Sequence, residues 1–176
     1  MALFISTTTN RIDKKGRVSV PALFRNNLSG NFAGVVLFRS LQSPLIEGCD
    51  YDRLMRLSTQ LETGLLSQAS LQSTSPITSN NETLTNNKDI MTHNPINPDY
   101  AAMMFAEAQM LSFDAEGRIS IPPSLLTHAN IIDQITFVGR GATFELWEPE
   151  AFIVHHEQMR QRLLMQASRQ QGGIHG

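Results

Sequence analysis

Five basic side chains form a cluster within fifteen residues near the start of the chain. They are Arg11, Lys14, Lys15, Arg17 and Arg25. Asp13 is the one acidic residue among them. An arginine can grip a phosphate or a guanine edge through two parallel hydrogen bonds, while a lysine acts as a point charge on the nucleic-acid backbone. The cluster therefore indicates binding of a polyanion, and nucleic acid in particular.

Charge is unevenly distributed along the 176 residues, although their formal net charge is only −2. Residues 1–60 carry eight basic and four acidic side chains, whereas residues 61–100 and residues 101–176 each carry a net charge of −3. The local field, rather than the overall sum, steers a polyanion. The first third of the chain is the part expected to attract one.

The basic cluster lies in a motif that occurs twice. Residues 11–21 read Arg-Ile-Asp-Lys-Lys-Gly-Arg-Val-Ser-Val-Pro, and residues 112–122 read Ser-Phe-Asp-Ala-Glu-Gly-Arg-Ile-Ser-Ile-Pro. The acid, the glycine, the arginine, the alternating apolar residues and the proline recur in one register. This is an internal repeat, and it predicts two copies of one structural unit.

The elements that position each motif follow from its residue types. Asp and Gly favour a tight turn, the alternating run favours a strand, and the proline suits the start of a short helix. Residues 34–39 and 134–138 are rich in β-branched and apolar side chains and predict further strands. Asp50 is placed to cap one longer helix, and Pro149 to open another.

A polar segment separates the two copies. From Ser67 to Pro98, 21 of 32 residues are Ser, Thr, Asn, Gln or Pro, and such a stretch buries too little apolar surface to offset its ordering entropy. We therefore predict a first repeat at 4–62, a flexible insertion at 63–99, a second repeat at 100–165 and a disordered tail at 166–176.

Two units of about fifty residues would each be marginally stable, but packed face to face they share one core. We expect an α+β, β-rich fold in which the chain forms a pseudo-dimer with itself. If the hairpins interleave, each half lends strands to the other and few sheet edges stay open. Both glycine turns would then lie on one related surface.

The doubled motif resembles that of the MraZ family, the double-repeat branch of the SpoVT/AbrB swapped-hairpin proteins. Residues 105–109 before the second motif and residues 138–149 after it extend the likeness, which covers roughly 4–62 and 100–165. The resemblance implies two tandem SpoVT/AbrB-type swapped-hairpin β-barrel repeats with short helices. It also implies a transcriptional regulator that binds short direct repeats in the promoter of a cell-division and cell-wall operon as a ring-shaped homo-oligomer.

In that family the Asp-x-x-x-Arg motif carries the DNA contact. The resemblance thus implies that this contact falls to Asp13 and Arg17 and, in the second copy, to Asp114 and Arg118. Together with the basic cluster, the expected DNA-binding residues are Arg11, Lys14, Lys15, Arg17 and Arg118. The residues expected to orient the motifs are Asp13, Gly16, Asp114 and Gly117. The expected partners are double-stranded DNA and further copies of the chain. Two features depart from the family: the 67–98 insertion is longer than usual, and Glu116 stands where a basic residue would help.

Other interpretations stay open. Asp13 and Arg17 can simply pair to hold the turn, and Asp114 and Glu116 crowd Arg118 with negative charge that repels phosphate. On the same fold, the chain could instead be an AbrB-like antitoxin or a protein-binding adaptor. An enzyme with Asp13 and Asp114 as paired carboxylates is disfavoured, because the arginines beside them and the turn chemistry suit a structural role better.

No cofactor, metal or membrane is expected. Cys49 is the only cysteine and lacks a convincing histidine partner, so we expect an inert thiol. His155 and His156 are adjacent and would point about 100° apart on a helix, which makes a poor metal pair. No apolar run approaches the roughly 18 residues of a spanning helix, and the first residues lack signal-peptide features. We expect a cytoplasmic protein associated with the nucleoid.

Overall fold

The computed structural model describes residues 2–28, 32–72 and 98–171. The first half contains β1 (Thr7–Arg11), β2 (Arg17–Ser19), α1 (Ala22–Asn27), β3 (Gly34–Arg39), β4 (Ile46–Cys49) and α2 (Tyr51–Gln72). After α3 (Pro98–Glu107), the same order recurs as β5 (Gln109–Ser112), β6 (Arg118–Ser120), α4 (Pro123–His128), β7 (Gln134–Gly139), β8 (Phe144–Trp147) and α5 (Pro149–Gln171). The internal repeat of the sequence is thus a repeat of structural elements.

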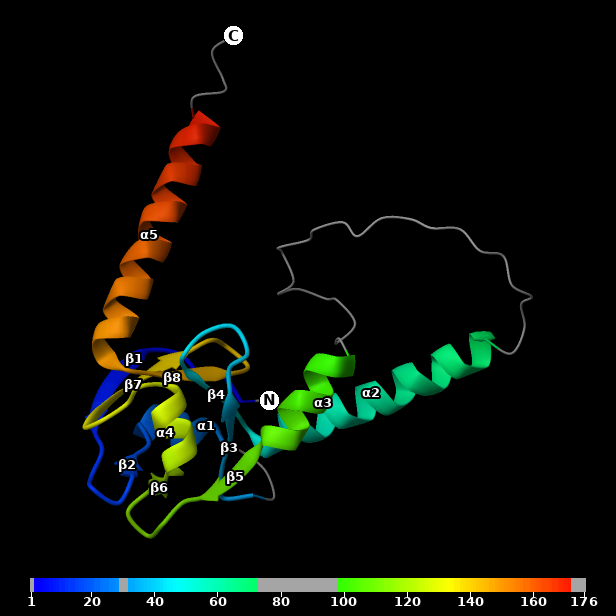
Figure 1. The fold of residues 1–176 in the computed structure, drawn as a ribbon, viewed down its shortest axis with the longest axis horizontal. Coiled ribbons are helices and arrows are strands. Elements are labelled where there is room, and N and C mark those ends of the chain that lie inside the picture. The colour runs from blue at the N-terminus through cyan, green and yellow to red at the C-terminus, as the bar shows by residue number, and fades with distance from the viewer. Residues whose placement is uncertain (1, 29–31, 73–97, 172–176) are drawn as a thin grey trace.

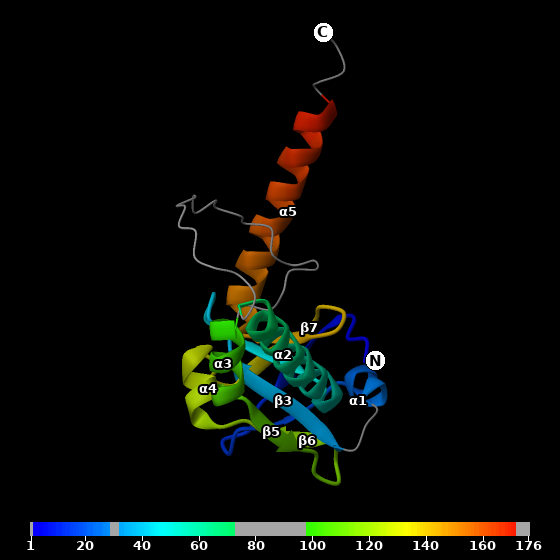
Figure 2. The same cartoon turned by 90° about the vertical axis from the view of Figure 1, so that its right-hand side faces the viewer.

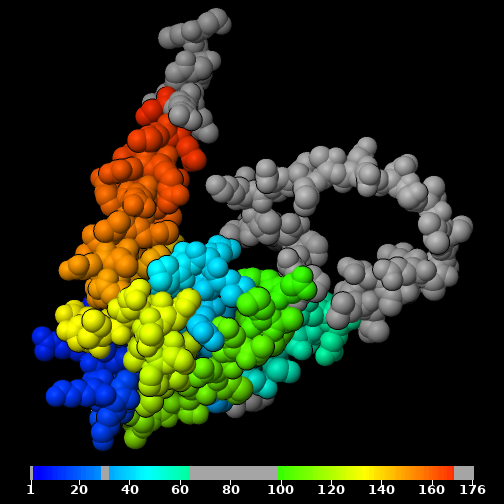
Figure 3. Space-filling view, in the orientation of Figure 1, coloured from blue at the N-terminus to red at the C-terminus, as the bar shows by residue number. Residues whose placement is uncertain are grey.

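The two halves exchange strands. The larger sheet is antiparallel with the order β1-β7-β8-β4-β3-β5, so β1 pairs with a strand of the second half and β5 with a strand of the first. In the middle of the sheet, β4 of the first half pairs with β8 of the second half. Figure 3 shows N-terminal residues in blue beside second-half residues in yellow-green at the lower end of the body. The interleaving that the sequence raised as a possibility is present in this α+β structure.

Strands β2 and β6 form a separate two-stranded antiparallel ribbon, with Val18 opposite Ile119. Both of these side chains are buried, and they face the main core between the ribbon, the large sheet and the short helices α1 and α4. Four phenylalanines occupy its centre, with ring centroids 4.8–6.0 Å apart: Phe4, Phe24, Phe137 and Phe144. One core therefore holds the ribbon to both halves.

Helices cover the other face of the sheet in two places. Helices α2 and α3 pack on β3, where Val36, Phe38 and Met104 are buried together. The first turn of α5 packs Phe152 on Trp147 of β8, with ring centroids 6.2 Å apart. Beyond these contacts, α2 and α5 leave the body in different directions (Figures 1 and 2).

The helix limits differ from the predicted unit boundaries. The Asp50 carboxylate accepts a hydrogen bond of 2.9 Å from the Arg53 amide at the start of α2, as expected of a cap. Helix α2 then continues past residue 62 to Gln72, and α5 continues past residue 165 to Gln171. Helix α3, which the sequence did not predict, starts inside the 63–99 range. The remainder of the predicted insertion, residues 73–97, lies outside the described residues, as do residues 172–176.

Candidate nucleic-acid interface

The first motif is a turn closed by the carboxylate of Asp13. One oxygen, Oδ1, accepts hydrogen bonds from the backbone amides of Lys15 and Arg17 at 2.8 and 2.9 Å. The other, Oδ2, accepts one from Nε of Arg17 at 2.7 Å. Gly16 has a φ of +76°, a conformation that glycine adopts without a steric penalty, and its amide donates to the Asp13 carbonyl. The spacing Asp-x-x-Gly-Arg is therefore the spacing at which one carboxylate closes this turn.

The second motif repeats this geometry closely. Oδ1 of Asp114 accepts from the amides of Glu116 and Arg118 at 2.9 Å each, and Oδ2 accepts from Nε of Arg118 at 2.8 Å. Gly117 has a φ of +72°. Both aspartates thus orient an arginine and stabilise a turn, the structural role that the sequence left open for Asp13.

These hydrogen bonds keep both carboxylates ionised. The bond from the backbone amide of Arg17 contributes most, and with the Arg17 guanidinium and the Lys15 amide it lowers the pKa of Asp13 to about 2. The equivalent bonds, led by the Arg118 amide, lower the pKa of Asp114. In return, the hydrogen bond to Asp114 raises the pKa of Arg118. Each aspartate is engaged with its own arginine, an arrangement unlike a pair of carboxylates that share a proton.

Each turn packs on the opposite half of the chain. The Gly16 carbonyl accepts a hydrogen bond of 2.8 Å from the Ile121 amide, and the Gly117 carbonyl accepts one of 3.2 Å from the Val20 amide. A Cβ atom on Gly16 would lie 2.6 Å from the Ile121 carbonyl oxygen. The strand exchange therefore determines the position of both turns, one at each end of the ribbon.

The outer face of the ribbon is polar. Because successive side chains of a strand point to opposite faces, burial of the middle residues turns the flanking ones outward. The four outward residues are Arg17, Ser19, Arg118 and Ser120. The side chains of Arg17 and Arg118 are 37% and 31% exposed. Two arginines, each held by an aspartate, thus lie on one accessible surface.

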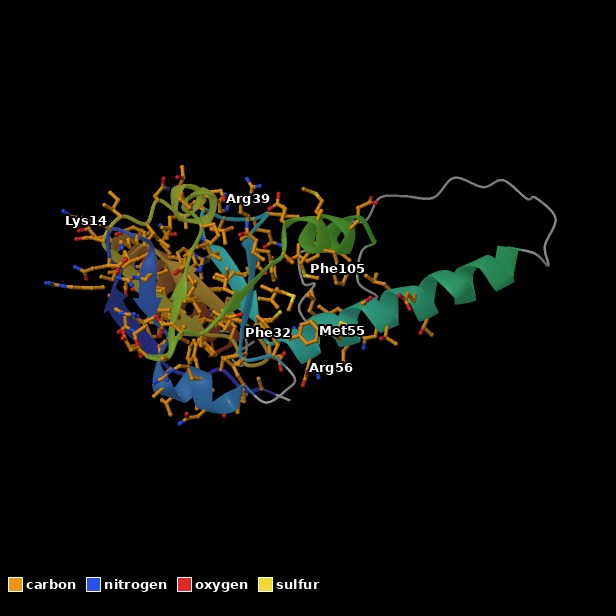
Figure 4. All side chains as sticks on the ribbon, turned by 90° about the horizontal axis from the view of Figure 1, so that it is seen from below. Lys14, Phe32, Arg39, Met55, Arg56 and Phe105 are labelled. Atoms are coloured by element: carbon orange, nitrogen blue, oxygen red, sulfur yellow. The ribbon has the colours of Figure 1, made fainter. Side chains whose placement is uncertain are left out.

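The two turns carry different charges. Arg11, Lys14 and Lys15 are exposed, and none of them forms an ion pair within the described part of the chain. Figure 4 shows Lys14 pointing away from the body, on the side opposite to α2. In the second turn Glu116 is exposed instead, and it pairs with Nη1 of Arg118 at 2.5 Å. The first turn is the more cationic of the two, as the sequence predicts.

Comparison with known proteins decides the family. Residues 104–171 match the family model described as "MraZ protein, putative antitoxin-like". The chain is 40% identical over 151 residues to a transcriptional regulator MraZ of Pelagibacter ubique (strain HTCC1062), which covers 85% of this chain and 81% of that protein. The chain belongs to the MraZ family. MraZ transcriptional regulators of Rickettsia akari (strain Hartford) and Rickettsia bellii (strain OSU 85-389) are 34% and 35% identical, over 88% and 86% of this chain and 87% and 85% of their own lengths.

Membership of the MraZ family makes the chain a transcriptional regulator of a non-enzyme family, so DNA binding and regulation of transcription follow.

Cys49 is buried, and desolvation raises the pKa of its thiol to about 12, which fits the inert role predicted for it. His155 stacks on Trp147 with ring centroids 4.7 Å apart. Within residues 2–28, 32–72 and 98–171, no group of three or more metal-binding side chains occurs, and no helix is long and apolar enough to span a membrane.

One residue of the basic cluster, Arg25, was not among the residues expected to bind DNA. Arg25 of α1 places its guanidinium against Gly117, in the turn of the other half. Aligning Asp13 with Asp114 also aligns Arg25 with Leu126. The sequence therefore showed that only the first copy has a basic residue at this position. It did not show that the two halves exchange strands, which is what brings Arg25 to the second turn.

Proposed function

We propose that the chain binds double-stranded DNA through the outer face of the β2–β6 ribbon and the turns at its two ends. The single observation that carries this proposal is the pair of outward arginines, Arg17 and Arg118, each oriented by an aspartate on an accessible two-stranded ribbon. The major groove of B-DNA admits a ribbon of two strands, and an arginine that reaches guanine there contributes to sequence recognition.

The proposed roles divide between the ribbon and the turns. Arg17 and Arg118 contact base edges or the phosphates that border them, because their guanidinium groups are held in a defined direction. The exposed residues Arg11, Lys14 and Lys15 contact phosphates and fix the register of the protein on the duplex. The contribution of Arg118 is the smaller of the two, because Glu116 occupies part of its guanidinium.

We further propose that the chain, as tandem SpoVT/AbrB-type swapped-hairpin β-barrels in a pseudo-dimer, assembles into a ring-shaped homo-oligomer. Large apolar side chains of α5 support self-association, since Leu163, Leu164 and Met165 are each more than half exposed. A head-to-tail interface closes into a ring when its rotation permits. Such a ring presents several ribbons to successive short direct repeats, which we propose lie in the promoter of a cell-division and cell-wall operon. Linked weak sites bind at high effective concentration, so the ring binds more tightly than one ribbon. The proposed place of work is the cytoplasm, at the nucleoid.

The test compares Arg17→Ala with Arg56→Ala by fluorescence anisotropy on a duplex that carries the promoter repeats. Arg56 lies on α2, far from Lys14 in Figure 4, and controls for the general loss of one positive charge. Losing a bidentate arginine contact weakens binding about 5- to 150-fold, so Arg17→Ala should raise Kd in that range while Arg56→Ala leaves it nearly unchanged. Equal Kd values for wild type and Arg17→Ala, with circular dichroism unchanged, would reject the assignment.

A second function on the same fold is an antitoxin or adaptor whose main partner is a protein. The exposed apolar residues Ile153 and Val154 of α5, together with the antitoxin-like description of the family, favour it. Light scattering of the purified protein, with and without promoter DNA, separates the alternatives. Without DNA, a mass of several times 19.6 kDa supports the homo-oligomer, whereas a stoichiometric second polypeptide supports the adaptor.

A further inference from the structure

Arg25 and Leu126 occupy the same position in the two copies, one on α1 and the other on α4. Each side chain lies beside the glycine turn of the opposite half. Leu126 Cδ1 is 3.7 Å from the place that a Cβ on Gly16 would take, whereas the Arg25 guanidinium lies directly against Gly117. The short helix thus contributes an apolar group to the first turn and a cation to the second.

The surroundings of Arg25 leave part of its guanidinium available. Its Nε donates a hydrogen bond of 3.1 Å to the Val20 carbonyl, which directs the side chain towards the second turn. Among the residues that the structure describes, no carboxylate forms an ion pair with it. It borders an open hollow of about 330 Å³ together with Leu28, Phe113 and Asp114.

Asp114 is the acidic residue among the described residues that line this hollow. Both of its oxygens already accept hydrogen bonds, from two backbone amides and from the guanidinium of Arg118. The remaining lining residues of the described chain include Phe32, Ala33 and Ala115, which carry no charge. An anion that entered the hollow would therefore meet the Nη groups of Arg25 as its principal donors.

We propose that Arg25 binds a DNA phosphate beside the second turn and supplies the positive charge that this turn's own sequence lacks. The first turn carries Lys14 and Lys15, while the second carries Ala115 and Glu116 at the equivalent positions. Because the two halves exchange strands, the basic first half contributes positive charge at both ends of the ribbon. Lys14 and Lys15 supply it at one end, and Arg25 supplies it at the other. A guanidinium that borders an open hollow and has no carboxylate partner among the described residues suits a phosphate, which accepts charge-assisted hydrogen bonds from it. This inference rests on the proposed binding face.

The test uses Arg25→Leu, Arg25→Gln and Arg25→Lys. Leucine is compatible with the fold, because Leu126 fills the equivalent position in the other half. The logarithm of the association constant falls with the logarithm of the salt concentration, and each phosphate contact makes this slope steeper by about 0.9. Losing one contact per engaged protomer therefore raises Kd about fivefold at 0.15 M salt. Arg25→Leu and Arg25→Gln should both show this reduced slope on the promoter duplex, whereas Arg25→Lys, which keeps the charge, should retain the slope of the wild type.

The outcomes separate this proposal from the one on which it rests. If the Leu and Gln variants keep the wild-type slope while Arg17→Ala weakens binding, the ribbon binds DNA without Arg25 and the present inference is wrong. If Arg17→Ala also binds normally, the binding face itself is wrong. A lower Tm in all three Arg25 variants with an unchanged salt slope would assign Arg25 a purely structural role through Val20 and would also overturn the inference. Arg25→Gln serves as the neutral variant should Arg25→Leu not fold.

Discussion

Substitution of Gly16 by alanine tests the strand exchange, because the backbones of the two halves are in close contact at this residue. Gly16 has a φ of +76°, and a Cβ there would lie 2.6 Å from the carbonyl oxygen of Ile121. That oxygen belongs to the backbone and cannot rotate away as the end of a side chain would. The Ile121 amide also donates to the Gly16 carbonyl at 2.8 Å, so the clash disturbs a hydrogen bond between the halves.

The expected loss has two parts. Alanine in the left-handed conformation costs about 1 kcal/mol, and displacing the turn weakens an inter-half hydrogen bond and its packing by about 1–2 kcal/mol more. The total is about 2–3 kcal/mol in the free energy of unfolding. For a chain of this size each kcal/mol lowers Tm by roughly 2–4 °C, so Gly16→Ala should unfold about 4–12 °C below the wild type.

Gly141→Ala is the matched control. Gly141 has a φ of +78°, but apart from its two chain neighbours no described residue has an atom within 4 Å of the place that an alanine methyl group would take. Only the conformational strain of about 1 kcal/mol therefore applies. Urea unfolding followed by circular dichroism measures both variants against the wild type. Equal losses in the two variants would show that Gly16 does not press on Ile121, and the packing of each turn on the opposite half would have to be abandoned.

Two further predictions follow from groups whose pKa is shifted. The pKa of Asp13 is lowered to about 2, so its ionised form stabilises the fold above the pKa of the unfolded chain, and this contribution is lost as the pH falls through 2. Asp13→Asn should therefore be less stable than the wild type at pH 7, and the difference between their urea midpoints should narrow between about pH 5 and pH 2. A difference that stays constant over this range would contradict the lowered pKa of Asp13. Burial raises the pKa of Cys49 to about 12, so the native thiol should resist a disulfide reagent at pH 8 and react fully in guanidinium chloride. Rapid reaction of the folded protein would contradict that burial.

Local chemistry made the turns and several strands predictable. The carboxylate, the glycine and the arginine of each motif lie within five residues, so their hydrogen bonds require no distant partner. The strand predicted at residues 34–39 has those limits in the structure, because five consecutive residues of β3 are buried and the run reads as apolar. The MraZ resemblance, drawn from the same motifs, is confirmed by relatives that span most of the chain.

Tertiary contacts determined what the sequence did not reveal. Helix α3 directly follows the polar segment, and its stability comes from packing Met104 and Phe105 with residues of β3 and α2 rather than from a strong local signal. The approach of Arg25 to Gly117 depends on the strand exchange, which joins residues about ninety positions apart. A repeat in the sequence indicates that two units are alike, but it does not say which unit's strand completes which sheet.

The most direct measurement of the central claim is site-directed photo-crosslinking to a duplex that carries the promoter repeats. Because Cys49 is buried, a cysteine introduced at the surface is the site that a benzophenone reagent labels. The two labelled variants are Lys14→Cys and Met55→Cys. Lys14 and Met55 lie at opposite sides of the body in Figure 4. Crosslinks to DNA from position 14 and none from position 55 are the result expected for a DNA-binding ribbon with its turns. Crosslinks from position 55 alone would place the DNA against α2 and contradict it.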